Sequence, residues 1–268
     1  MHPILNIAIR VVRKGGNILI QNYDNQKIHY EKQAGKHELI SKMIEISEKL
    51  MINIIHKSYP EHIIITQKNT NIVFKMSEIV WFINALDGIS NFERNLPHFC
   101  VSVAVIIRKT TEISVIYDPL RNELFTAVKG QGAQLNGYRM RCNNVSVLNR
   151  SLIGITLPYK RYHINENFLK IVNTFLLENV KLRSTGCINL DYSYISVGRL
   201  DFLCNFDIQP FILTAGFLQV KEAGGLISDP NGGNNYFLFR SVLVGNAKLM
   251  RVILIELRKY LSFNNTIT

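Results

Sequence analysis

One stretch constrains the fold of this chain more than any other, because it joins a buried strand to a glycine turn. The apolar run 78–83 predicts the strand, and it leads into Ile83-Asn84-Ala85-Leu86-Asp87-Gly88-Ile89-Ser90-Asn91-Phe92. A turn of this kind brings carboxylates and backbone N–H groups together at a strand's end. Such a site suits a divalent cation held against a phosphate group.

The composition predicts a folded chain with a sizeable core. The chain has 268 residues, of which 47% are hydrophobic and 19% are charged, and this balance excludes a disordered protein. No apolar run reaches the roughly 18 residues of a membrane span, and the N-terminus does not have the pattern of a signal peptide. The cysteines lie far apart in the sequence, without metal-type spacing, and we expect reduced thiols in a cytoplasmic protein: Cys100, Cys142, Cys187 and Cys204.

The net charge of +11 allows two interpretations. A basic protein can bind nucleic acid or an acidic protein. Alternatively, the charge reflects compositional drift in a chain that is rich in Ile, Asn and Lys. The basic residues are scattered without a run of five or more, which favours drift over a selected patch.

Hydrophobic periodicity predicts an α/β architecture with helices on both faces of the sheets. In the first half we expect two long helices, with Gly15-Gly16 interrupting the first at a close packing contact, and then a series of strands and a glycine-punctuated hairpin. In the second half, helices alternate with strands. The expected helices are 2–23, 38–56, 167–178, 187–197, 211–223 and 247–261. The expected strands are 63–66, 78–83, 101–108, 112–117, 123–128, 180–183, 200–204, 225–228 and 241–244.

The segment 84–92 resembles the first signature of the inositol monophosphatase family, Asp-Pro-(Ile/Leu)-Asp-Gly-Thr-x-Asn-Phe. The resemblance covers nearly the whole chain, and segments 117–127 and 130–139 are similar to a bacterial branch of the family. It implies a layered αβαβα sandwich of the inositol monophosphatase and fructose-bisphosphatase type. It also implies a single domain over 1–268, made of two tightly packed lobes, roughly 1–150 and 151–268.

The resemblance further implies a Mg²⁺ site with four carboxylate positions and one backbone carbonyl. Phosphate ester hydrolysis needs metal ions to activate water and to neutralise the leaving group. The four positions are Gln67, Asn84, Asp87 and Ile212, and the carbonyl is that of Leu86. Asp87 alone is still acidic, and Lys68 adds a positive charge that opposes a cation. We therefore expect Mg²⁺ binding to be weak or lost.

The catalytic and substrate-binding positions implied by the resemblance are also altered. Gln67 and Ile89 stand where the family orients the attacking water, so we expect no functional catalytic residue there. Asn205 stands where the family grips substrate hydroxyls with Glu, whereas Arg183 and Gly186 are retained. The implied substrate-binding positions, in degenerate form, are Leu86, Asp87, Gly88, Ile89, Arg183 and Asn205.

Two individual residues also have structural interpretations. Asp87 can cap the short helix after Gly88 or pair with Lys68, and we favour such a structural role over metal binding. His98 follows Pro97, and we expect a packed, hydrogen-bonded histidine rather than a catalytic base.

Three functions remain open. The resemblance to the bacterial branch implies a homodimeric Nus factor for rRNA transcription antitermination and ribosome biogenesis, acting with RNA polymerase, NusA, NusB, NusG and ribosomal protein S10, with rRNA nearby. The second is a Mg²⁺-dependent inositol-1-monophosphatase with reduced activity. The third is a phosphate or sugar-phosphate sensor that uses N–H groups near Gly88 and Ile89 together with Arg183.

Overall fold

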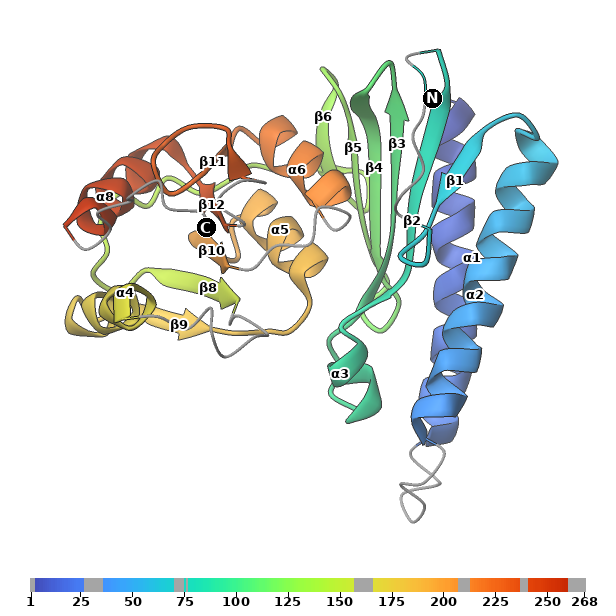
Figure 1. Cartoon of the computed structure of the whole chain (residues 1–268), viewed down its shortest axis with the longest axis horizontal. Helices are drawn as coiled ribbons and strands as arrows, with labels where there is room; N and C mark the ends of the chain where they lie inside the picture. The colour runs from blue at the N-terminus through green and yellow to red at the C-terminus, as the bar shows by residue number, and fades with distance from the viewer. Residues whose placement is uncertain are drawn as a thin grey trace, which may run out of the picture.

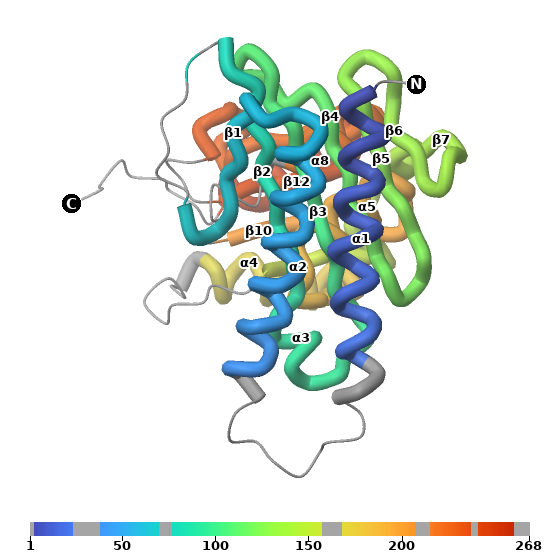
Figure 2. Tube along the Cα trace, turned by 90° about the vertical axis from the view of Figure 1, so that its right-hand side faces the viewer, coloured from blue at the N-terminus to red at the C-terminus, as the bar shows by residue number. Residues whose placement is uncertain are grey.

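Helices and sheets alternate in five layers along the long axis of the molecule (Figure 1). The computed structural model describes residues 3–26, 36–69, 75, 77–156, 166–206, 213–236 and 241–259. The helices are α1 (Pro3–Gln26), α2 (Lys36–Ser58), α3 (Ile89–Glu93), α4 (Glu166–Leu177), α5 (Ile188–Ser196), α6 (Leu213–Glu222) and α8 (Ala247–Arg258). Helices α1 and α2 lie side by side on the outer face of the first sheet (Figure 2). Helices α5 and α6 lie between the sheets, and α4 and α8 cover the far side of the second. This αβαβα order confirms the predicted fold class.

The first sheet follows the order of the chain. Its strands are β1 (Ile63–Ile65), β2 (Ile79–Asp87), β3 (Cys100–Ile107), β4 (Thr110–Asp118), β5 (Glu123–Val128), β6 (Gly132–Leu135) and β7 (Tyr138–Arg139). Strands β1 and β2 are parallel, and each later pair is antiparallel. Alternation and short turns in the sequence predict such a meander, and the five strands and the hairpin expected here are confirmed.

The second sheet has the order β11-β12-β10-β8-β9. Its strands are β8 (Leu152–Thr156), β9 (Lys181–Arg183), β10 (Phe202–Phe206), β11 (Leu226–Ser228) and β12 (Ser241–Gly245). The sequence analysis missed β8, which pairs with both β10 and β9. Gly154 weakens the strand signal there, yet a Cβ at this position would lie 2.9 Å from Leu203 Cδ1. The glycine that obscures the strand thus allows close packing against the side chain of the neighbouring strand.

Helix α1 passes through Gly15 and Gly16 without a break, so the predicted interruption is wrong. The predicted close contact is confirmed. A Cβ at Gly15 would lie 2.8 Å from Met51 Sδ of α2, and one at Gly16 would lie 2.9 Å from Tyr117 Cδ1 of β4. The two glycines allow α1 to approach both neighbours, and this close packing outweighs their low helix propensity.

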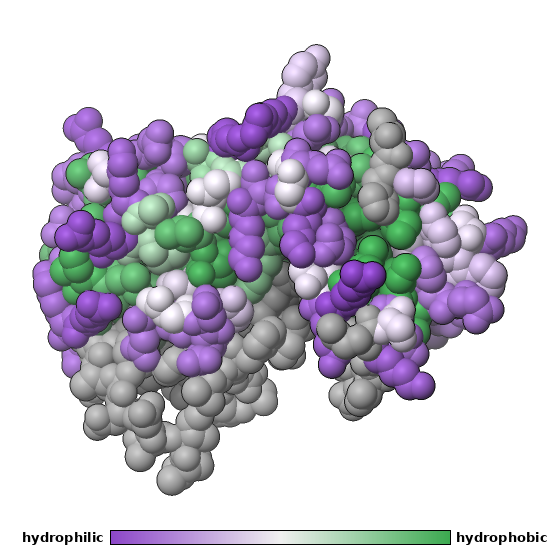
Figure 3. All heavy atoms as spheres, turned by 90° about the horizontal axis from the view of Figure 1, so that it is seen from above, coloured by the Kyte–Doolittle hydropathy of each residue, from purple (hydrophilic) through white to green (hydrophobic). Residues whose placement is uncertain are grey.

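A hydrophobic cluster joins the first sheet to the middle helices. It contains Cys100 and Phe125 from the sheet, together with Cys187, Leu190 and Leu218 from the segment that forms α5 and α6. The outer surface is different: seen from above, hydrophilic side chains are interspersed with separate hydrophobic patches (Figure 3). Among the described residues, the longest helices are too polar to cross a bilayer.

The packing of α6 against α5 leads to a stability prediction. A Cβ at Gly216 would lie 2.6 Å from Tyr192 Cβ, at the root of a buried side chain that cannot swing away. We expect Gly216→Ala to lower the free energy of unfolding by about 2 kcal/mol, measured by urea denaturation. Lys221→Ala, at an exposed position of the same helix, is the control and should change it by less than about 0.5 kcal/mol. Equal stability of the two variants would contradict the packing argument.

Candidate functional site

The site is built on the turn that ends β2. The pairing of β2 with β3 is irregular between Asn84 and Asp87. Gly88 then adopts a left-handed conformation, with φ of 87°, and a Cβ there would lie 2.8 Å from the His98 carbonyl oxygen. A glycine is therefore required at the point where the strand turns into α3.

Asp87 connects this turn to α5. Its Oδ2 accepts a hydrogen bond of 2.8 Å from the backbone N–H of Asn189, in the first turn of α5. A carboxylate at a helix N-terminus satisfies an otherwise unpaired donor. Burial raises the pKa of Asp87, and the hydrogen bonds from Asn189 oppose that shift.

Both structural roles predicted for Asp87 assign the wrong partner to its carboxylate. Helix α3 begins at Ile89, and its N-cap residue is Gly88, without a side-chain cap. In the described part of the chain, no ion pair joins Asp87 to Lys68. Lys49 first, and then the charge of Lys68, lower the pKa of Glu45 on α2, whereas burial raises the pKa of Glu48 against the charge of Lys68. The sequence correctly suggested a helix cap but could not reveal that the helix lies 102 positions further along the chain.

Two cysteines lie against Asp87. Cys100 Sγ and Cys187 Sγ are 3.6 Å apart, and the Cys187 thiol donates to the Asp87 carbonyl oxygen at 3.6 Å. Both side chains are fully buried, and all four cysteines are free thiols. Burial raises the pKa of Cys100 to about 11 and that of Cys187 well above its usual range. The spacing of the cysteines in the sequence does not predict this pair, because Cys100 begins β3 and Cys187 precedes α5.

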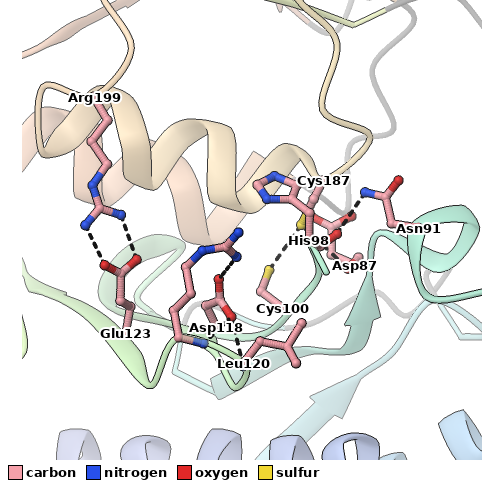
Figure 4. A network of polar contacts seen from close by, with 10 residues as sticks. Asp87, Asn91, His98, Cys100, Asp118, Leu120, Glu123, Cys187 and Arg199 are labelled. Carbon is pink, nitrogen blue, oxygen red and sulfur yellow. Dashed lines mark hydrogen bonds and ion pairs between the residues drawn. The ribbon is translucent and has the colours of Figure 1, made fainter. Parts of the chain in front are cut away.

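Asn91 fixes α3 to both halves of the chain. Its Nδ2 donates to the carbonyl oxygens of His98 and Thr185, each at 2.8 Å. Figure 4 shows the hydrogen bond to His98. The conformation of Gly186 has a φ of 76°, and a Cβ there would lie 3.2 Å from Asn91 Oδ1. Asn91 and Gly186, two residues that carry the family resemblance, therefore contact each other.

Of the other predicted positions, Gln67 follows β1, Asn84 lies on the paired strand β2, and the predicted water-orienting residue Ile89 begins α3. Gln67 is exposed in the turn after β1. Asn84 is 5% exposed, and its Oδ1 accepts from the buried Leu86 N–H at 3.3 Å. Its Nδ2 has no hydrogen-bond partner within the described ranges. Ile89 is half-buried and packs against the core of the first sheet. Ile212 lies outside the described residues.

The predicted substrate-gripping residues belong to the second sheet. Arg183 is exposed on β9, and its Nη1 donates to the neighbouring Leu182 carbonyl at 2.8 Å. Asn205 is buried on β10 and donates to the Tyr192 hydroxyl at 3.2 Å. Where the structure describes the chain, neither residue forms a hydrogen bond with Asp87.

His98 packs beside the site, with its ring centroid 5.8 Å from that of Tyr194. This confirms the predicted packing. The predicted hydrogen bond is absent at Nε2, which is buried without a partner among the described residues. Burial first, and then the charge of Arg121, lower the pKa of His98.

Two ion pairs border the site (Figure 4). Asp118 is fully buried and binds Arg121 Nη1 at 2.7 Å, while its Oδ1 accepts from the backbone N–H groups of Leu120 and Arg121. Glu123 binds both terminal nitrogens of Arg199, one of them at 2.6 Å. The second pair is bidentate and links the start of β5 to the loop after α5.

Known proteins with similar sequences belong to the family that this geometry suggests. A sequence profile of the inositol monophosphatase family matches residues 1–262. The protein Nus factor SuhB of Buchnera aphidicola subsp. Baizongia pistaciae is 58% identical over 264 residues, covering 98% of this chain and 99% of that protein. Nus factor SuhB of Escherichia coli K12 is 40% identical over 262 residues, covering 98% of both.

Solved structures agree with the sequence relatives. The extragenic suppressor protein suhB from Bartonella henselae superposes with a TM-score of 0.85 and 26% identity, covering 97% of this chain and 100% of that one. An inositol monophosphatase from Anabaena superposes with a TM-score of 0.83 and 25% identity, covering 97% of each chain. The match of fold, signature turn and nearly full-length sequence shows that the chain belongs to the inositol monophosphatase family.

Proposed function

We propose that this protein is a Nus factor that supports rRNA transcription antitermination and ribosome biogenesis. The observation that carries the proposal is the 58% identity, over nearly the full length of both chains, to a relative named Nus factor SuhB. The proposed partners are RNA polymerase, NusA, NusB, NusG and ribosomal protein S10, with rRNA nearby. Such a role depends on surfaces and requires no metal centre.

We further propose that the turn after β2 has lost the ability to bind Mg²⁺ well. Magnesium prefers an octahedron of oxygen ligands that includes carboxylates. Among the described positions, Asp87 is the single carboxylate, and its Oδ2 already accepts from Asn189. Asn84 offers a neutral amide whose oxygen accepts from Leu86, and Cys100 and Cys187 place sulfur beside Asp87. This donor set does not fit Mg²⁺.

The second candidate is a Mg²⁺-dependent inositol-1-monophosphatase with reduced activity. It is favoured by the retained Asp87, Gly88 and Asn91 at the strand-to-helix turn, and by the family itself. An ion would then depend on Asp87, the Leu86 carbonyl, water and substrate oxygens.

Hydrolysis of myo-inositol 1-phosphate across a Mg²⁺ titration separates the two candidates. We expect no Mg²⁺-dependent turnover above that of an Asp87→Asn variant, because a single carboxylate cannot hold the ions that activate water. The Anabaena inositol monophosphatase serves as the active control. Turnover that Asp87→Asn abolishes would favour the phosphatase over the loss of the metal site.

Association with the transcription machinery tests the first proposal directly. Purified protein would be mixed with E. coli RNA polymerase and NusA and analysed by gel filtration, with the E. coli relative as the positive control. Co-elution with both is expected. Failure to co-elute under conditions where the control does would count against the Nus factor role.

The remaining proposals follow from the same role. A protein that acts beside RNA polymerase works in the cytoplasm. We also propose that the protein is a homodimer, and light scattering would measure its mass. We also propose that residues 1–268 form one domain, with two lobes of roughly 1–150 and 151–268.

A further inference from the structure

Three potential metal ligands converge where the first sheet meets the middle helices. The carboxylate of Asp87 and the thiols of Cys100 and Cys187 place their ligand atoms within 4.8 Å of one another. Cys100 begins β3, Asp87 ends the adjacent β2, and Cys187 is the N-cap residue of α5 (Figure 4). The three residues therefore come from rigid elements on both sides of the junction.

The distance between the two sulfur atoms matches a tetrahedral thiolate site. With Zn–S bonds of about 2.3 Å, two thiolates on one tetrahedral ion lie about 3.8 Å apart. Cys100 Sγ and Cys187 Sγ are 3.6 Å apart. Sulfur ligands select Zn²⁺ and other thiophilic ions over Mg²⁺, which takes oxygen.

One feature of the surroundings favours anionic ligands, although burial raises the pKa of both thiols when no ion is bound. The N-terminus of α5 carries the positive end of the helix dipole, which stabilises a thiolate at Cys187 and the carboxylate of Asp87. Asn189, which donates its backbone N–H to Asp87, is 1% exposed. Its Oδ1 has no hydrogen-bond partner in the described part of the chain. This oxygen is therefore an unused potential metal ligand on a residue that already contacts Asp87.

We propose that Asp87, Cys100 and Cys187 bind a thiophilic divalent cation of the Zn²⁺ type. The ion joins the first sheet to α5 and serves structure rather than phosphate chemistry. Binding converts two thiols into thiolates and releases their two protons to solvent. This site goes beyond the proposed Nus factor role and does not depend on it.

Metal titration of the full-length protein tests the site. The protein would be reduced, treated with a chelator and titrated with Zn²⁺ or with Co²⁺, whose sulfur-to-metal charge-transfer absorption reports thiolate ligands. We expect one ion per chain and the release of two protons. Cys100→Ser and Cys187→Ser should each lose most of the charge-transfer band, and Asp87→Asn should weaken affinity about tenfold or more.

Cys204 provides the matched control, because it is equally buried but lies on β10 outside the cluster. Cys204→Ser should retain the band and the stoichiometry. A wild-type protein that shows no charge-transfer band with Co²⁺ after reduction would overturn the proposal, and so would equal loss of the band in Cys204→Ser. The wild-type measurement keeps the test valid even if a variant fails to fold, and it uses neither phosphatase activity nor RNA polymerase binding.

Discussion

Restoring the acidic residues is expected to make the stability of this protein depend on Mg²⁺. In a Gln67→Glu, Asn84→Asp, Ile212→Asp triple variant, the new carboxylate at position 84 replaces an amide that is 5% exposed, on the same strand as Asp87. Burying that charge without a cation should lower the free energy of unfolding by about 3 kcal/mol. Saturating Mg²⁺, at about 100 times its Kd, should return about 2.7 kcal/mol.

Denaturant unfolding with and without Mg²⁺ measures both effects. Asn84→Asp alone is the control: it should be destabilised but gain much less from Mg²⁺, because it restores one ligand of the set. The wild-type protein should not respond. If Mg²⁺ stabilised the wild type as strongly as the triple variant, the existing donors would suffice and the proposed loss of the metal site would be wrong.

Raising the pH from 5 to 8 is expected to destabilise the protein through Asp191. This residue is 3% exposed, and its pKa is raised to about 8, mainly by burial and further by the charge of Asp87. A hydrogen bond of 2.8 Å from the Thr185 hydroxyl to its Oδ1 opposes this shift. In the unfolded chain an Asp titrates near pH 3.9, so between about pH 4 and 8 the native state holds a proton that the unfolded state has lost. The contribution of Asp191 is thus full at acidic pH and declines by about 1.4 kcal/mol for each pH unit up to 8.

An Asp191→Asn variant isolates this effect. The amide keeps an oxygen to accept from Thr185 and exchanges no proton, so the free energy of unfolding should fall less steeply with pH than in the wild type. Asp87 remains in both proteins, so its raised pKa contributes to both curves. Unfolding measured at four pH values from 5 to 8 gives the difference in slope. Parallel curves would show that Asp191 is ionised in the native protein.

Local patterns in the sequence predicted most elements of the fold, because periodicity is set by which side of an element is buried. The helices over 3–26 and 36–58 and the strands of the first sheet follow directly from this. Strand β8 was missed because Gly154 serves a packing contact with Leu203, which is distant in sequence. The break expected at Gly15 and Gly16 does not occur, because the contacts of α1 with α2 and β4 outweigh the low helix propensity of glycine.

The candidate site could be predicted only in part. The turn with Asp87 and Gly88 is a local motif, and its position at a strand's end was foreseen. Its partners come from segments about one hundred residues away, as with Asn189 and Cys187. Neither periodicity nor spacing in the sequence encodes these contacts, since they depend on how α5 lies against the first sheet.

The arrangement of α5 and α6 between the sheets has a consequence during synthesis on the ribosome. The first sheet is complete at Arg139, whereas α6, which covers the inner face of β4 and β5, ends at Glu222. At about 5–20 residues per second, the intervening 83 residues take roughly 4 to 17 seconds to translate. For that interval the nascent chain exposes an apolar sheet face, so the cell's chaperones have a defined window in which to bind it.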